Sequence, residues 1–532
     1  MDLISNLPKH ILHDILSRMP EKDAARTSIL SKSWKDTCST SPVLVFVGPR
    51  YGIMNKTEEK MEDLIRKRNN FLNYVDSTLQ RFHDQGLAIK QFKICLNFSD
   101  PHTLSPRIDY WMELSSESGV GVLHLTLFRP MLCQGEKYCL PPNILASKSL
   151  VKLILYGCFT VDKAFVNHPI KFRSLQVLSL SYVYVGEDQI IQNIISSCPM
   201  IENMTLKYCS GLKFVSIHSL PKLKVADFRG IQDVFVDAPS LEYFHYFSDD
   251  VNAACMNNMD KCRQLRGLCL SFPRNIIINN QWLLELFLKF PLLESLELEK
   301  CTISRKIQIS SMQLKVLKFS SCFKLEEACI DAPKLYSCSY HGCEFTMPNA
   351  FLFNSSSRLE FNVKFEIGFQ VDFLELRKFI ENIKPKNFMV SIALDLCYPT
   401  DEFNPCVVQN LSVPPPCIKD LHLHLLSDEE TLCLPLLIGL LWSCRPASIS
   451  IKLNSTSCSR TIIKLLCDML MERSNNCCCS NALLKCWWYE LKDVRITSPS
   501  WKDENSVIDC KTLLDVLPTL SIKEEIKFRL ES

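Results

Sequence analysis

The chain has 532 residues, more than one compact core normally holds, so several domains or a repeat array are expected. Its 60 lysines and arginines nearly balance its 58 aspartates and glutamates, and the formal net charge of +2 gives no general reason to expect nucleic-acid or membrane partners. Asp2 and Lys9 interrupt what would be the apolar region of a signal peptide, and the uncharged apolar stretch at residues 431–444 is too short to span a bilayer. These features predict a soluble protein of the cytoplasm or nucleus.

The first forty residues predict two or three short amphipathic helices. Pro8 opens the first helix, where its missing N–H costs nothing, and Pro20 ends it. Asp23 is a plausible cap for the next helix, which we expect to continue to Leu30. Because a unit this small rarely closes a core of its own, its surplus apolar face is expected to be a docking surface. The apolar face of the first helix consists of Ile11, Leu12, Ile15, Leu16 and Met19.

This segment resembles an F-box, whose pattern is Leu-Pro, an Ile/Leu-rich helix, Leu-Ser-x-Leu-Pro and then Arg-x-Ser-x-Leu-Ser-x-x-Trp. The positions that match in order are Leu7, Pro8, Ile15, Leu16, Ser17, Pro20, Arg26, Ser28, Leu30, Ser31 and Trp34, with Met19 in place of a usual leucine. The resemblance implies docking on a Skp-family adaptor and, through it, on a cullin. The adaptor-binding residues that it implies are Leu7, Pro8, Ile11, Leu12, Ile15, Leu16, Met19, Pro20, Leu30, Ser31 and Trp34. The alternative is an ordinary helical hairpin that packs on the rest of the chain.

The middle of the chain repeats the unit L-x-x-L-x-L, often followed by x-x-C, at intervals typical of a leucine-rich repeat. In L-x-L both leucines point to one side of a short strand and the residue between them points to the other. Stacked units therefore predict a parallel sheet in a solenoid, with the outward strand positions forming a binding surface. An ordinary α/β sheet with similar strands is the alternative. The target-binding residues that we expect are Ile154, Ser179, Thr205, Glu297 and Lys318.

Twenty-seven cysteines would suggest disulfides in a secreted chain, but their number is odd and no signal peptide is found. No two C-x-x-C pairs are separated by the spacing of a zinc site, and the three consecutive cysteines at residues 477–479 have no neighbouring histidine. His422 and His424 lack a third ligand, so no metal or cofactor is expected. The cysteine that ends each repeat resembles the cysteine-containing repeat subtype. In that subtype Cys158, Cys209, Cys301, Cys322 and Cys343 would be buried.

Four regions are expected along the chain. Residues 1–45 form the F-box, 46–119 a coupling region with a helix and a strand, 120–426 the solenoid, and 427–532 a C-terminal cap. Residues 186–199 predict a helical connector, whereas Asp-Ala-Pro-x-Leu at 237–241 and 331–335 predicts tight turns. The last region resembles the FBD of plant F-box/leucine-rich-repeat proteins at residues 440–446 and 485–496. An end cap is preferred there over ligand stacking by Trp487 or Trp488.

The chain contains no P-loop, no G-x-G-x-x-G, no G-x-S-x-G and no H-E-x-x-H motif, so an enzyme is not expected. The predicted fold is an α/β chain in which all-α F-box helices precede an irregular leucine-rich-repeat solenoid with a C-terminal α/β cap. The resemblance implies a substrate-receptor subunit of an SCF-type cullin–RING ubiquitin ligase that holds an unknown target protein on its repeats. Two alternatives are a leucine-rich-repeat scaffold without a ligase role and a ligand-dependent sensor of the same family.

Overall fold

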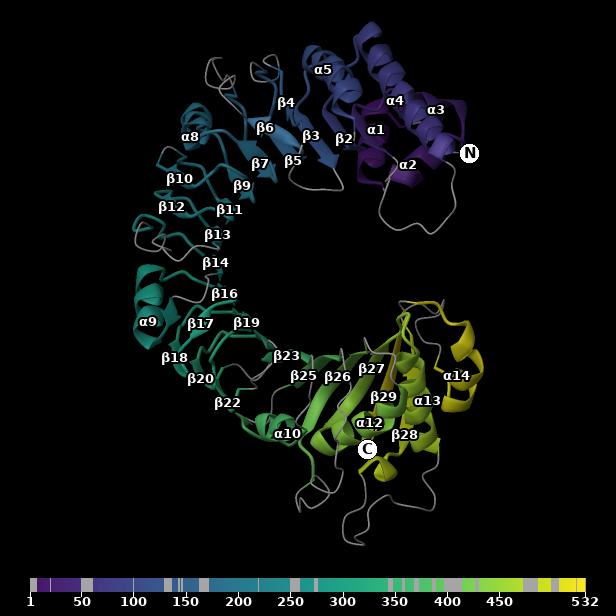
Figure 1. Cartoon of the computed structure of the whole chain (residues 1–532), viewed down its shortest axis with the longest axis vertical. Helices are drawn as coiled ribbons and strands as arrows, with labels where there is room; N and C mark the ends of the chain where they lie inside the picture. The colour runs from purple at the N-terminus through teal and green to yellow at the C-terminus, as the bar shows by residue number, and fades with distance from the viewer. Residues whose placement is uncertain are drawn as a thin grey trace. The chain divides into compact units, whose positions relative to one another are not determined.

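The computed structural model divides into two compact units, Met1–Leu265 and Arg266–Ser532, which are described separately below (Figure 1). It describes residues 7–19, 21–48, 61–98, 100–128, 136–141, 144, 147–161, 172–218, 220–248, 259–271, 276–342, 348–355, 359–367, 373–384, 389–396, 414–425, 430–471, 487–498, 507–522 and 524–531. The predicted fold class is confirmed, because N-terminal helices precede a strand-rich repeat region in a mixed α/β chain. None of the helices in these ranges is long and apolar enough to cross a membrane.

The first unit begins with three short helices, α1 (Lys9–Arg18), α2 (Glu21–Thr27) and α3 (Lys32–Ser39). Helix α2 starts two residues before Asp23, so Asp23 is not its cap, and the helix ends before Leu30. A third helix, α3, then follows with Ser31 as its cap, so the segment contains three short helices. Pro20, the predicted end of the first helix, lies outside the described residues.

A parallel ladder follows these helices. Its strands pair in the order β1 (Val43–Val47), β2 (Gln91–Asn97), β3 (Val122–Phe128), β5 (Lys152–Gly157), β7 (Val177–Ser181), β9 (Asn203–Lys207), β11 (Val225–Arg229) and β13 (Tyr243–Phe247). The ladder thus begins well before residue 120, where the solenoid was expected to start. The predicted helix and strand of the coupling region are α4 (Met61–Asp84) and β2, and a further helix, α5 (Pro101–Glu117), packs against α4.

Short outer strands run beside this ladder. They are β4 (Tyr138–Cys139), β6 (Phe159–Val161) and β8 (Tyr184–Val185) in one group, and β10 (Phe214–Ile217) and β12 (Asp233–Val236) in another. The predicted connector is α8 (Asp188–Ser197), which Figure 1 shows outside β7 and β9. No helix occurs between β12 and β13, as the proline-containing turn at 237–241 predicts.

The second unit continues the same kind of structure. Its inner ladder is parallel through β14 (Gly267–Ser271), β16 (Ser295–Glu299), β19 (Val316–Cys322), β21 (Ser337–Gly342), β23 (Glu360–Ile367), β25 (Met389–Leu396), β26 (Cys417–Leu425) and β27 (Arg445–Lys452). Strand β29 (Glu525–Glu531) then pairs antiparallel with both β27 and β28 (Asp493–Thr497). Its outer strands are β15 (Ile277–Ile278), β17 (Thr302–Ile303), β18 (Lys306–Ser310), β20 (Glu327–Asp331), β22 (Ala350–Asn354) and β24 (Ile383–Lys384).

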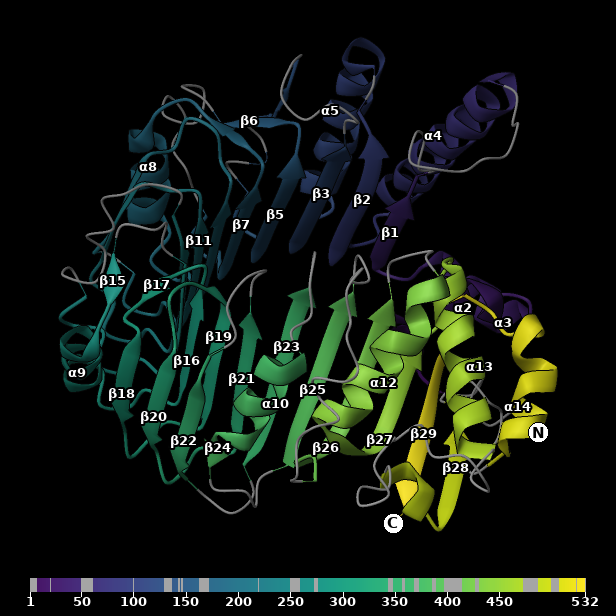
Figure 2. The same cartoon turned by 60° about the horizontal axis from the view of Figure 1, so that its bottom comes forward.

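Helices cover one face of the last strands of this unit. The helices of the second unit are α9 (Asn280–Lys289), α10 (Phe373–Glu381), α12 (Cys433–Ser443), α13 (Ser457–Met471) and α14 (Cys510–Val516), with 3₁₀ turns η2 (Glu430–Leu432), η3 (Trp487–Glu490) and η4 (Leu517–Thr519). Figure 2 shows α10, α12 and α13 in front of strands β25–β27. They pack on one another in sequence order and bury one side of these strands.

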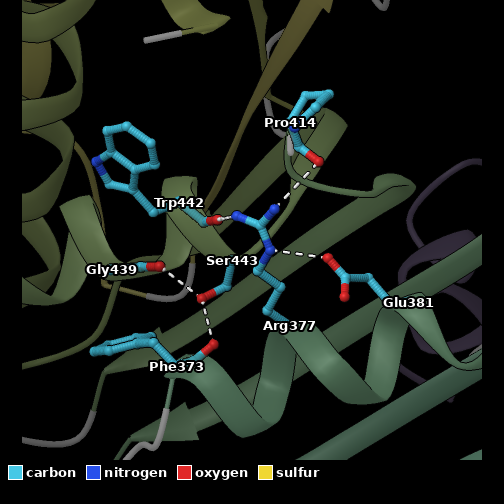
Figure 3. A network of polar contacts seen from close by, with 7 residues as sticks. All are labelled: Phe373, Arg377, Glu381, Pro414, Gly439, Trp442 and Ser443. Atoms are coloured by element: carbon cyan, nitrogen blue, oxygen red, sulfur yellow. Dashed lines mark hydrogen bonds and ion pairs between the residues drawn. The ribbon is translucent and has the colours of Figure 1, made fainter. Parts of the chain in front are cut away.

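A buried arginine ties two of these helices together (Figure 3). Arg377 on α10 is 2% exposed and donates to the carbonyl of Trp442 on α12 at 3.2 Å, to the carbonyl of Pro414 at 3.3 Å and to Glu381 at 2.9 Å. Ser443 bridges the same helices, because its hydroxyl donates to the carbonyls of Phe373 and Gly439. A buried charge whose hydrogen bonds are satisfied in this way fixes the relative position of α10 and α12.

Candidate binding surfaces

The three N-terminal helices have a small core of their own. Leu12, Leu16 and Trp34 are 2%, 6% and 5% exposed, and Met19, Ala24 and Cys38 pack against them. All three buried residues belong to the predicted adaptor-binding set. Because they present almost no surface in this conformation, their role here is to hold α1, α2 and α3 together.

Hydrogen bonds fix the ends of these helices. The Ser31 hydroxyl accepts the backbone N–H of Trp34 at 3.2 Å, which satisfies one of the free donors at the start of α3. Pro8 precedes α1, and its carbonyl accepts the N–H of Ile11 at 2.9 Å. The His13 ring lies between α1 and α3, with Nε2 at 3.2 Å from the carbonyl of Thr37. Burial lowers the pKa of His13, so the neutral ring is favoured.

Other members of the same set remain exposed. Leu7 just before α1 and Ile11 in its first turn are 38% and 40% exposed, and Leu30 in the turn before α3 is 66% exposed. Ile29 beside it is 83% exposed and was missed, because the F-box pattern includes Leu30 but not Ile29. Ile15 and Met19 are half-buried. Exposed aliphatic side chains gathered on so small a module are typical of a protein-binding surface.

The strands of the first unit carry the expected alternation. Leu153 and Leu155 are 2% and 1% exposed, whereas Ile154 between them faces away from the core. Ile154 pairs in register with Ser179, and Ser179 pairs with Thr205. Three of the predicted target-binding residues therefore lie side by side across β5, β7 and β9. We call this side of the ladder, from β2 to β13, the first strand face.

A line of aromatic rings lies along the carboxyl ends of these strands. We call it the aromatic row, and it consists of Phe128, Tyr156, Tyr182, Tyr208 and Phe247. Successive ring centroids are 5.6, 5.2, 5.4 and 6.2 Å apart, and the rings of Tyr182 and Tyr208 are stacked. The row was not predicted, although a tyrosine recurs near the end of the repeats in the sequence, as in LILYG and MTLKYC.

The predicted residues of the second unit form an ion pair. Glu297 and Lys318 are register neighbours on β16 and β19, and their charged groups lie 3.7 Å apart. Glu294 nearby accepts Lys315 at 2.9 Å and Arg266 at 3.1 Å, and Lys315 foremost holds the pKa of Glu294 below its usual value. These ion pairs are partly exposed, so each contributes little to the stability of the unit. They do present charged groups on the surface of the strands.

The repeat cysteines are mostly buried as free thiols. Cys209, Cys301 and Cys322 are 3%, 0% and 3% exposed, and each Sγ donates to a backbone carbonyl of a neighbouring turn of the solenoid. Burial raises the pKa of Cys209 to about 12. Cys158 is only half-buried, which corrects the expectation for that position, and Cys343 lies outside the described residues.

Other candidate sites of the second unit have structural partners. The indole of Trp487 donates to the carbonyl of Leu441 at 2.7 Å, and Trp487 and Trp488 are 6% and 2% exposed, so neither offers a face for a ligand. His422 lies 3.8 Å from Glu525, and no group of three potential metal ligands occurs in the described ranges. Residues 477–479 lie outside those ranges.

Two family models match the first unit. The F-box domain matches residues 4–46, which contain α1, α2 and α3, and the model "FBD-associated F-box protein At5g56370, LRR repeats" matches residues 108–265. The chain therefore combines a small helical module similar to an F-box with a ladder similar to leucine-rich repeats.

The chain is also similar to several proteins from Arabidopsis thaliana. They include the putative F-box protein At3g58860, which is 30% identical over 49% of this chain and 55% of its own length. F-box/FBD/LRR-repeat protein At1g78750 is 26% identical, and F-box/LRR-repeat protein 13 is 27% identical, over the same shares. The match thus spans about half the length of these relatives. Over the matched residues the chain is similar to F-box/leucine-rich-repeat proteins.

Proposed function

We propose that this chain is the substrate-receptor subunit of an SCF-type cullin–RING ubiquitin ligase. Its F-box would bind a Skp-family adaptor and, through it, a cullin, while its strand faces would hold a target protein. The chain would perform no chemistry itself and would act by raising the local concentration of the target's lysines near the ubiquitin donor. We extend the proposal to the cytoplasm or nucleus, the compartments that the sequence predicts.

One observation carries this proposal. Leu12 and Leu16 fill the small core of the F-box, whereas Ile11 on the same helix, Leu7 just before it and Leu30 remain exposed. The exposed residues belong to the F-box pattern or to its apolar face, yet they contribute little to holding α1, α2 and α3 together. Aliphatic side chains in such positions gain stability only when a partner covers them.

Co-purification of the full chain with a Skp-family adaptor tests the docking half. Ile11→Asp puts a charge where the adaptor would cover an aliphatic side chain, and an unpaired charge in an apolar interface is costly. Adaptor binding should weaken by about a hundredfold or more. Ile65→Asp on α4 is the matched control, because Ile65 is also an exposed isoleucine on a helix, at 51%. Wild-type protein that is folded but does not bind the adaptor, or equal binding by Ile11→Asp, would contradict the proposal.

Target capture needs a separate test. Proximity labelling with the full chain should first identify a target. Charge reversal at Glu297 or Lys318 should then weaken capture of that target without changing adaptor binding or thermal stability, because both side chains lie on the surface. Unchanged capture by both variants would remove these two residues from the target-binding set.

A further inference from the structure

A residue at or directly after the end of the strand has an unusual backbone conformation in four consecutive repeats of the first unit. Following the register from β5 to β11, this position is Gly157, Tyr182, Tyr208 and Gly230, with φ of 100°, 58°, 49° and 72°. Glycine adopts positive φ freely, whereas a residue with a Cβ is disfavoured there. The first and the last of these four repeats have glycine there, so the solenoid itself does not require an aromatic side chain at this position.

The two tyrosines are also poorly covered. Tyr182 is 40% exposed and Tyr208 is 38% exposed, and their rings stack on each other at 5.4 Å. Gly230 lies beside this stack, because a Cβ there would meet the Tyr208 ring at 3.1 Å. Phe128, at the other end of the row, is 40% exposed. Lys300 and Ser321 have positive φ at the corresponding position of the second unit, so Tyr182 and Tyr208 are distinguished by their exposed rings and not by their backbone.

The charge of the first strand face is unbalanced. Among its described strand residues that point away from the core, the charged ones are Lys93, Lys152, Lys207, Arg229 and Asp227. Asp227 accepts Lys207 at 2.6 Å and Arg229 at 3.0 Å, so a single carboxylate holds two cations beside each other. Lys207 precedes Tyr208 directly, and in the register Arg229 pairs with both Lys207 and Phe247, which places these cations at the aromatic row.

We propose that the aromatic row binds an extended, acidic peptide segment of the target. The row crosses the strands as a line of rings, which suits a chain lying across the ladder with apolar side chains on the rings. Carboxylates of the segment would meet Lys207 and Arg229, whereas a basic segment would face like charges. This inference rests on the proposed function only where it assigns the peptide to a target protein. Peptide binding itself does not require the adaptor.

Two fluorescein-labelled random copolymers test the proposal on the full chain by fluorescence anisotropy. The probe is a copolymer of glutamate and tyrosine, and the control is a copolymer of lysine and tyrosine of the same length. The glutamate copolymer should bind and should weaken between 50 and 300 mM salt, because partly exposed charges are screened. The lysine copolymer should bind at least about tenfold more weakly. Equal binding of the two copolymers would overturn the proposal.

Variants locate the binding on the aromatic row. Tyr182→Gly with Tyr208→Gly installs the residue that neighbouring repeats already use, and it should weaken binding of the glutamate copolymer about tenfold or more without lowering thermal stability much. Tyr336→Ala is the matched control, because Tyr336 is an exposed tyrosine (54%) of the second unit that lies outside the row. Wild-type affinity in the double variant would overturn the proposal.

Adaptor binding by the same proteins separates the two proposals. The double glycine variant should keep full adaptor binding, and Ile11→Asp should keep full binding of the glutamate copolymer. A wild-type chain that binds the copolymer but does not bind the adaptor would contradict only the ligase role. Adaptor binding without copolymer binding would contradict the peptide site alone.

Discussion

Replacing Tyr182 by glycine and by alanine separates the cost of its backbone conformation from the value of its ring. Both variants lose the ring contacts with Tyr156 and Tyr208, at 5.2 and 5.4 Å. Only glycine also relieves the φ of 58°. Because the left-handed conformation costs a residue with a Cβ about 1–2 kcal/mol, Tyr182→Gly should be more stable than Tyr182→Ala by about 1 kcal/mol.

Differential scanning calorimetry of the purified chain measures this difference. For a unit of this size, 1 kcal/mol corresponds to a shift of about 2–4 °C, so the glycine variant should melt higher than the alanine variant by about 2 °C. Thr205 in the middle of β9 is the control, because glycine in a strand interior is less stable than alanine by about 0.5–1 kcal/mol. The order of the two variants should therefore reverse between positions 182 and 205. The same order at both positions would refute the reasoning.

Three further predictions concern buried groups. Leu12→Ala should destabilise the F-box by about 2–5 kcal/mol while Ile11→Ala changes it little, as read from amide exchange in α3, and equal effects would contradict the division into core and surface. Arg377→Leu leaves the buried carbonyl of Trp442 without its donor, at about 1–3 kcal/mol, and also removes the hydrogen bond to the carbonyl of Pro414, so the second unit should melt lower, and an unchanged melt would argue against the network. Burial raises the pKa of Cys209 to about 12, so its contribution to stability is complete below its unfolded pKa of about 9 and is lost as pH rises towards 12. The free energy of unfolding should therefore fall above about pH 9, and it should fall less steeply in Cys209→Ala. Native Cys209 should also resist alkylation by iodoacetamide, and rapid labelling of the native protein would contradict its burial.

The repeat strands could be predicted because L-x-L alternation follows directly from strand geometry. Leu296 and Leu298 are both 0% exposed, and Glu297 between them reaches the surface. The connector α8 and the proline-containing turns were predictable for similar local reasons. In each case the pattern within about ten residues determines the structure.

Features that depend on distant packing were not predictable. Helix α5 was missed because Pro101 and Pro106 are usually signs of a break; Pro101 begins the helix, where proline is tolerated, but Pro106 lies inside it. Arg377 resembles a surface residue until α12 covers it. Helical periodicity identified the apolar face of α1, but it could not separate buried Leu12 from exposed Ile11, because that depends on how α3 packs.

The left-handed tyrosines illustrate a different limit. Residue preference predicts glycine at a position with positive φ, so Tyr182 and Tyr208 ran against the local signal. Only the register of the neighbouring strands shows that they share a position with Gly157 and Gly230. The candidate target surface was therefore predicted as strand positions, without the aromatic row beside them.

Hydrogen–deuterium exchange of the full chain, with and without a Skp-family adaptor, tests the central claim most directly. The adaptor should slow exchange at the beginning of α1 and in the turn before α3, where Ile11 and Leu30 are exposed. Exchange in strands β5–β9 and β16–β19 should stay unchanged, because the target surfaces remain open in that complex. Protection of the strands without protection of the F-box, or no protection at all under conditions where both proteins are folded, would contradict the account.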